Sequence, residues 1–74
     1  MPDLPYKAYH IRLLSQLKDG LWYPEALVLA DTATGSIGTP IYDTQGYALK
    51  DMADERALTL AKQSVDAKER EKGR

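Results

Sequence analysis

Apolar and polar residues alternate in the N-terminal part of the chain. Between Tyr6 and Leu17 the odd positions are largely apolar and the even ones polar, with a local break at Leu14 and Ser15. A period of two is typical of a half-buried β-strand. The next residues include the pair Asp19-Gly20, which favours the positive φ angles of a tight hairpin turn. The pattern therefore predicts a strand that turns back into the following segment.

The following segment, residues 21–30, is apolar on both faces after Glu25. Such a run is typical of a strand that lies centrally or is covered on each side. Pro24 qualifies this interpretation, because proline has no N–H to donate to a ladder. It must lie at a strand start, at a bulge or at a position that makes no ladder bond.

Turn-forming residues then occupy positions 31–36, and residues 37–43 indicate a third, shorter strand interrupted by Gly38 and Pro40. These two residues favour an edge position. Gly46 marks another turn, and residues 47–49 form a short extended piece before the helix.

The C-terminal third has helical periodicity. Ala57, Leu58, Ala61 and Val65 recur at spacings of three and four and form one apolar stripe. Asp51 is the expected N-cap, so the helix should begin at Asp51 or Met52. We expect an α+β fold, in which a three-stranded antiparallel sheet (βββ) is followed by one amphipathic helix packed on one face.

The 74 residues allow one domain over residues 1–74, with an ordered core over about 6–66 and a charged tail at 67–74 that frays. Such a chain buries only about 60% of the surface of its unfolded form, so small domains often need disulfides, a structural metal or oligomerisation to be stable. Cysteine is absent and there is one histidine, which removes disulfides and thiolate or histidine-cluster metal sites. Self-association is another way to enlarge a core, and we predict a homodimer.

Charge and hydropathy bear on the partners and the cellular location of the protein. The formal net charge is −1, which disfavours a nucleic-acid partner because it attracts a polyanion weakly. The N-terminal residues do not resemble a signal peptide, and no apolar stretch approaches the roughly 20 residues that span a bilayer. We expect a cytoplasmic protein without membrane contact.

No residue pattern indicates catalysis. His10 falls on the polar face of the first strand, as solvated strand histidines do. Asp51, Asp54 and Glu55 are explained by capping and by the helix dipole rather than by metal binding. The serines lack the spacing of known nucleophile motifs. We expect no enzyme activity, no cofactor and no metal.

All aromatic residues precede the helix. Tyrosine and tryptophan can form a binding surface, a platform that stacks on bases, or the rim of a small core. Trp22 and Tyr23 should point to opposite faces of a regular strand, which places at least one of them away from the helix. The candidate binding residues on and around these strands are Tyr9, His10, Arg12, Trp22, Tyr23 and Tyr42.

The order of elements, with residues 6–11 opening the first strand, Trp22 and Ala26 in the second and Gly46-Tyr47-Ala48 before an alanine-rich helix, resembles short uncharacterised bacterial proteins of sheet-then-helix type. It more distantly resembles HicB-type antitoxins and the sheet-plus-helix half of double-stranded-RNA-binding domains. Those resemblances imply toxin neutralisation or nucleic-acid contact. The chain lacks the glycine-rich strand of the first family and the basic helix start of the second, so no functional residue carries over.

Two hypotheses follow. In the first, the protein is a non-enzymatic interaction module that uses an exposed sheet face or an edge strand. In the second, it is a nucleic-acid-binding regulator in which Lys7, Arg12 and Lys18 contact phosphates and aromatic rings stack on bases.

Overall fold

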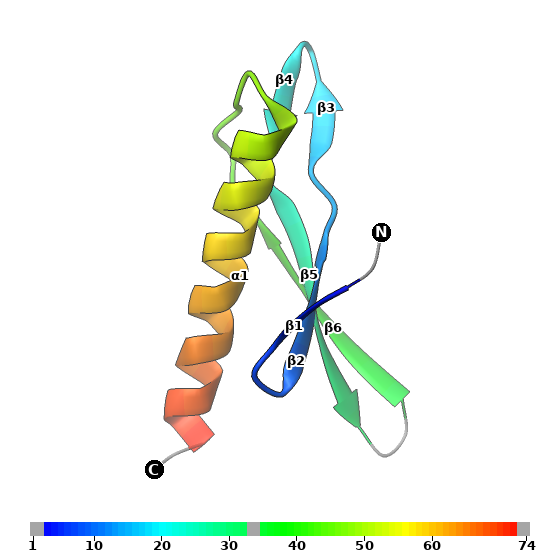
Figure 1. Cartoon of the computed structure of the whole chain (residues 1–74), viewed down its shortest axis with the longest axis vertical. Helices are drawn as coiled ribbons and strands as arrows, with labels where there is room; N and C mark the ends of the chain where they lie inside the picture. The colour runs from blue at the N-terminus through cyan, green and yellow to red at the C-terminus, as the bar shows by residue number, and fades with distance from the viewer. Residues whose placement is uncertain (1–2, 33–34, 73–74) are drawn as a thin grey trace.

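The computed structural model describes residues 3–32 and 35–72 (Figure 1). Its strands come first and its single described helix last, which confirms the predicted α+β order. The elements are β1 (Leu4–Tyr6), β2 (Tyr9–Leu13), β3 (Gln16–Lys18), β4 (Leu21–Tyr23), β5 (Glu25–Thr32), β6 (Gly35–Tyr42) and α1 (Lys50–Lys72).

The prediction of a single three-stranded sheet was wrong. The strands form a four-stranded antiparallel sheet in the order β1-β2-β5-β6 and a separate two-stranded sheet, β3-β4. One reason is a tight turn near the N-terminus. Lys7 has a φ of 55°, and Tyr6 pairs with Tyr9, so β1 folds back along β2 and adds a strand at that edge.

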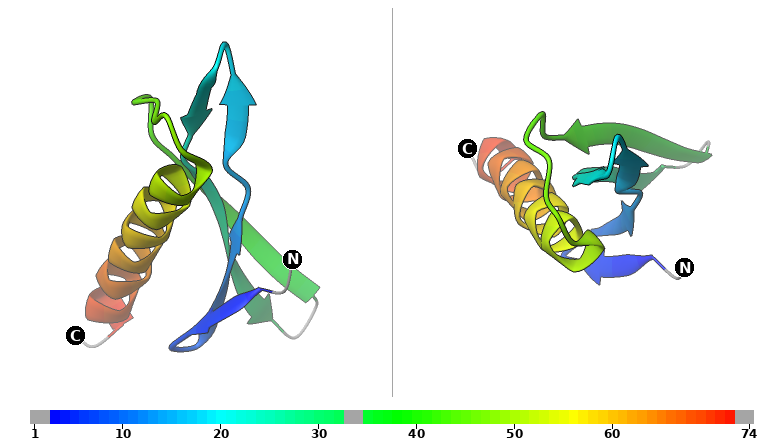
Figure 2. Two further views of the ribbon diagram at one scale, coloured as in Figure 1. Left: turned by 45° about the horizontal axis from the view of Figure 1, so that its top comes forward. Right: turned by 90° about the horizontal axis from the view of Figure 1, so that it is seen from above.

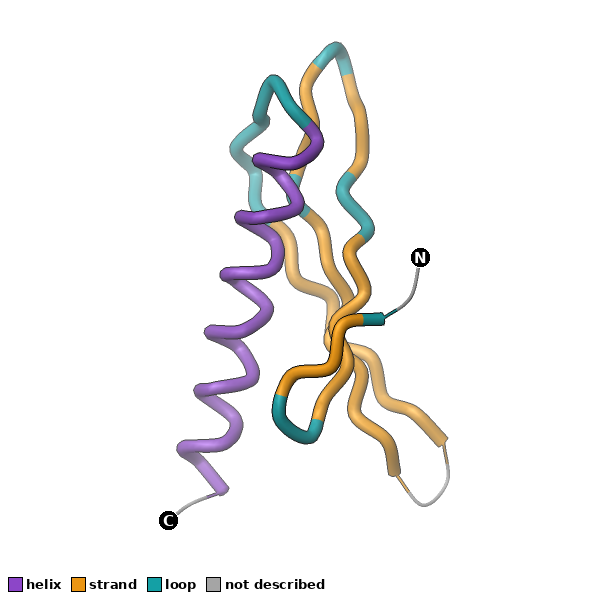
Figure 3. The backbone as a smooth tube through the Cα atoms, in the orientation of Figure 1, coloured by secondary structure: helices purple, strands orange, loops and turns teal. Residues whose placement is uncertain are grey.

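The second reason is an interruption in the long hairpin that the sequence predicted. Both halves keep one register, because Leu13 pairs with Ala26 and, beyond the break, Gln16 pairs with Tyr23. The interruption lies at residues 14–15 and at Pro24 (Figure 3). Pro24 thus occupies a site between two strands. The predicted turn at Asp19-Gly20 is present, with φ angles of 53° and 82°.

The third predicted strand lies at a sheet edge, as expected for β6. Its ladder with β5 is longer than predicted, because pairing continues as far as Thr32 and Gly35. Most of the predicted turn at 31–36 is therefore strand, and residues 33–34 lie outside the described residues.

Helix α1 begins one residue earlier than expected. The Ala53 backbone N–H donates to the Leu49 carbonyl at 3.3 Å, so Leu49 takes the N-cap position and Asp51 lies inside the first turn. The N-cap prediction for Asp51 was wrong. Two backbone hydrogen bonds of 2.7 Å tie Tyr47 to Trp22, and the chain enters the helix directly after this anchor. The helix also continues through Lys72, beyond the predicted ordered core.

The predicted apolar stripe of α1 packs on the sheet. Ala57, Ala61 and Val65 are fully inaccessible, and Ala53 extends the stripe toward the N-terminus. Leu58 is only half-buried at its margin. The buried sheet residues are Tyr9, Ile11, Ala26 and Val28. Alanine at three helix positions leaves little volume between helix and sheet, so the layers lie close.

A polar cluster ties the C-terminal half of α1 to the β1–β2 turn. The Asp66 carboxylate accepts a hydrogen bond from the Tyr6 hydroxyl at 3.0 Å and from the Lys7 ammonium at 2.6 Å. The Lys7 contact, followed by the Tyr6 hydroxyl, lowers the pKa of Asp66. Farther along, Lys68 donates to the Thr39 hydroxyl at 3.0 Å.

Ala61→Leu should destabilise the fold by about 1–3 kcal/mol, because the buried alanine leaves no room for three more carbon atoms. The free energy of unfolding from urea titration measures this loss. Gln63→Leu, on the exposed side of the same helix, is the control and should change it by less than about 0.5 kcal/mol. Equal effects of the two substitutions would contradict the packing described.

Asp66→Asn should lower stability at pH 7. Because the pKa of Asp66 is lower in the folded protein, its ion pair contributes fully above the unfolded pKa of about 3.9 and is lost as the pH falls through the folded value. The difference between the two proteins should therefore shrink below about pH 4, as thermal unfolding between pH 2 and 7 would show. Glu71→Gln is the control, and an Asp66→Asn difference that is independent of pH would contradict the ionic role.

Candidate functional site

The sheet has one face that α1 does not cover (Figure 2). Side chains alternate between faces, so the neighbours of the buried residues in β2 and β5 point away from the helix. We call this surface the open face. Two rows of paired residues cross it, His10–Leu29–Gly38 and Arg12–Leu27–Pro40. Its described residues include Pro5, His10, Arg12, Tyr23, Glu25, Leu27, Leu29, Gly38, Pro40 and Tyr42.

Two leucines of β5 form the middle of the open face. Leu27 and Leu29 are both half-buried among their neighbours. Leu27 leans over Gly38, where an added Cβ would lie 3.0 Å from Leu27 Cδ1. Gly38 and Pro40 add no long side chain beside the leucines, and Arg12, directly across from Leu27, is held by Asp3.

The polar residues beside this apolar centre are already paired. Arg12 donates to both carboxylate oxygens of Asp3, at 2.9 and 3.2 Å. The Arg12 hydrogen bond lowers the pKa of Asp3. His10 lies between Pro5 and Leu29 in the same row. The charge of Arg12 is therefore balanced locally.

The open face continues into a groove of about 380 Å³ at the base of the β3–β4 arm. Its walls carry two tyrosines and several charged or polar side chains. The lining residues are Gln16, Lys18, Asp19, Tyr23, Pro24, Glu25, Tyr42, Asp43 and Thr44.

Pro24 explains why a groove forms there. The Asp43 backbone N–H donates to the Pro24 carbonyl at 3.2 Å, but proline has no N–H with which to return the bond. The ladder between β5 and β6 ends at this pair. The chain then leaves the sheet and crosses to Tyr47, passing so close to β4 that a Cβ on Gly46 would lie 2.9 Å from Leu21 Cβ.

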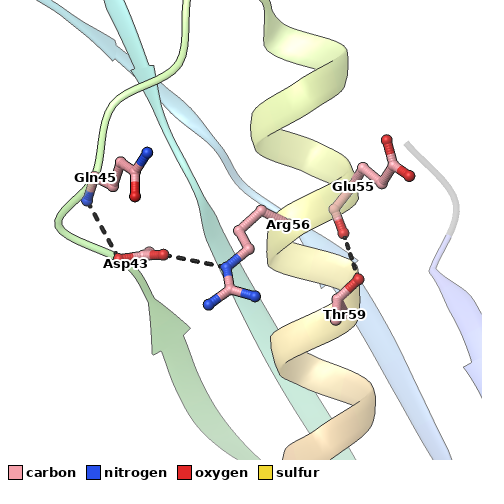
Figure 4. A network of polar contacts seen from close by, with 5 residues as sticks. All are labelled: Asp43, Gln45, Glu55, Arg56 and Thr59. Atoms are coloured by element: carbon pink, nitrogen blue, oxygen red, sulfur yellow. Dashed lines mark hydrogen bonds and ion pairs between the residues drawn. The ribbon is translucent and has the colours of Figure 1, made fainter.

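The loop after β6 is held to the helix by Asp43 (Figure 4). Its carboxylate accepts from the Gln45 backbone N–H at 3.2 Å and from Arg56 Nε at 3.3 Å. These two contacts, the Gln45 N–H first, hold the pKa of Asp43 below its usual value. One wall of the groove is thereby fixed.

The structure brings together four of the six predicted binding residues. His10, Arg12, Tyr23 and Tyr42 all belong to the open face, and the Tyr42 side chain is 69% exposed. Tyr23, rather than Trp22, is thus the aromatic residue of β4 that points away from the helix.

The other two predicted residues lie on the helix side. Tyr9 is 5% exposed within the core, with the Lys68 ammonium 5.7 Å from its ring centroid. Trp22 is half-buried, pairs with Tyr47 and has the Lys50 ammonium 6.0 Å from its ring. Neither side chain contributes to the open face.

Sequence reasoning missed Leu27, Leu29 and Pro40 as site residues. The signal was present, since residues 26–30 have the continuous apolar character of a strand covered on both faces. The described helix covers only one face of this strand.

Both edge strands of the four-stranded sheet carry a proline. The hydrogen bond from the Asp43 N–H to the Pro24 carbonyl shows which residues of β6 bond to β5. The residues that alternate with them, including Pro40, direct their backbone N and O atoms away from the sheet. The bond from Leu14 to the Glu25 carbonyl, at 2.7 Å, likewise places Pro5 of β1 in an outward position. Each edge thus lacks an outward N–H at its proline, which disfavours strand addition.

Within residues 3–32 and 35–72, no three side chains of histidine, aspartate or glutamate gather in a way that could hold a metal ion. Lys50 pairs with Asp54 at 2.7 Å in the first turns of α1. The described helix is not long and apolar enough to cross a membrane.

No protein-family model, curated protein or solved structure matches the chain.

Proposed function

We propose that the protein is a non-enzymatic interaction module that binds another protein surface through its open face, and that the partner is a second copy of the same chain. The observation that supports this proposal is the position of Leu27 and Leu29, two leucines in the centre of a sheet face that no described helix covers. A partner sheet would complete the two-sided burial that is typical of this apolar pattern.

A second copy suits this surface for three reasons. The proline-bearing edges leave the face as the better docking surface. The described helix leaves the face uncovered, and two β-sheets can pack face to face about 10 Å apart. Its Arg12 charge is balanced by Asp3, so two copies related by a two-fold axis would not bring unpaired arginines together.

The size of the face sets the expected affinity. The four strands have 3, 5, 8 and 8 residues; at a strand spacing of about 4.8 Å and a rise of about 3.3 Å per residue they give a face of roughly 380 Å². Two copies would bury roughly 760 Å² in total, below the standard size of a specific interface and in the range of weak, transient complexes. We therefore expect a weak dimer with a dissociation constant of roughly 100 µM.

The same contacts give less support to a nucleic-acid partner. Arg12 is paired with Asp3 and Lys7 with Asp66, so two of the three cations considered for phosphate contact already have carboxylate partners. Binding to phosphates would require these ion pairs to be replaced.

Sedimentation equilibrium between 5 and 500 µM should show a reversible monomer–dimer equilibrium. Leu27→Glu should weaken dimerisation at least tenfold, because it would bury a carboxylate at the centre of the interface. The folded monomer should tolerate the change, since Arg12 lies directly across from position 27.

Leu17→Glu is the matched control. Leu17 is 57% exposed and pairs with Trp22, on the helix side of the β3–β4 arm, so this variant should dimerise like the parent. A parent protein that is monomeric at 500 µM would refute the proposal, as would equal dimerisation of Leu27→Glu and the parent.

A further inference from the structure

The groove at the base of the β3–β4 arm carries chemistry that the apolar dimer surface does not use. Glu25 lies directly across from Tyr42 in the ladder and two residues after Tyr23 on the same face. Paired Cβ atoms in such ladders are about 5 Å apart, and same-face neighbours along a strand about 6.6 Å. A carboxylate is thus set between two tyrosines.

The charges of the lining favour a cation. Asp19, Glu25 and Asp43 supply three carboxylates against one ammonium, that of Lys18. Asp43 is partly balanced by Arg56, which leaves Asp19 and Glu25 as the main negative groups. Gln16 donates to Glu25 Oε2 at 3.2 Å and restrains that carboxylate. The groove therefore combines negative charge with aromatic walls.

From this combination we infer that the groove binds an arginine side chain presented by an extended segment of a partner protein. A guanidinium group is flat, stacks on aromatic rings and donates to a carboxylate in a fixed geometry, which an ammonium group does less well. The volume of about 380 Å³ lies at the small end of the range of ligand sites, which suits one side chain and its flanking backbone. Tyr42, at 69% exposure, leaves the groove open to such a segment.

This site adjoins the proposed dimer contact at Leu27 and Leu29, since the Glu25–Tyr42 pair lies two ladder positions from the Leu27–Pro40 pair, but the two can be tested apart. In a dimer centred on those leucines the groove would lie toward the rim. Leu29→Glu, which places a carboxylate in the same apolar contact but four residues from Glu25, should bind the arginine segment as the parent does, whether or not the parent dimerises.

The probe is a capped pentapeptide with one arginine among alanines, titrated into the ¹⁵N-labelled full chain. Amide signals of residues lining the groove should shift and saturate. The same peptide with citrulline, which keeps the shape of arginine without its charge, should bind at least fivefold more weakly.

Tyr42→Ala should weaken arginine-peptide binding roughly two- to fivefold, and Glu25→Gln by a similar factor of about two to five.

Tyr42→Phe keeps the ring and should retain binding, and Glu71→Gln, far from the groove on α1, is the charge control. The NMR spectrum of each variant reports whether it is folded. Equal affinity for the arginine and citrulline peptides would overturn the inference. So would shifts that cluster outside the groove, or the absence of saturable shifts at 20 mM peptide.

Discussion

Within the described part of the chain, one helix covers one face of the sheet, and the rest of the structure follows from this packing. Ala53, Ala57 and Ala61 are fully inaccessible where α1 packs against the sheet. The apolar side chains of β2 and β5 that point to this face, Tyr9, Ile11, Ala26 and Val28, form the core with the helix stripe. The side chains that alternate with them have no covering element among the described residues, so the surface available for binding is decided by the packing of α1.

Pro24 has the second largest influence on the architecture. Its missing N–H ends the ladder between β5 and β6, while its carbonyl still accepts the Asp43 N–H. The chain therefore leaves the sheet at Asp43 and returns to pair with Trp22 at Tyr47. Together with residues 14–15 on the neighbouring strand, Pro24 marks the boundary between the four-stranded sheet and the β3–β4 arm, and the groove lies beside it.

The two surfaces on the open face differ in chemistry. The centre is apolar, and its Arg12 charge is paired with Asp3, which is suited to burial against a similar surface. The groove is concave, aromatic and acidic, which is suited to a single cationic group. The two regions adjoin along β4 and β5, so a small sheet face carries two surfaces of different chemistry.

The sequence by itself determined the local elements. Alternation in residues 6–17 predicted one strand, which the structure divides among β1, β2 and β3. Asp19-Gly20 predicted the hairpin turn, and Gly38 and Pro40 predicted the edge position of β6. The spacing of Ala57, Ala61 and Val65 predicted the buried stripe of α1, because each of these signals depends on neighbouring residues alone. It also placed His10 on the polar face. It did not predict β1, since the positive φ of Lys7 has no glycine or asparagine to signal it.

Only the tertiary structure decided which of these residues meet. The alternation shows that Trp22 and Tyr23 face opposite ways, but which side the helix covers depends on packing between segments far apart in the chain. That packing buried Tyr9, turned Trp22 toward Tyr47 and left Tyr23 beside Tyr42. The apolar run of β5 indicated burial on both faces, and the fold supplies it on one, because a chain with one described helix and one such sheet has a single layer with which to cover it.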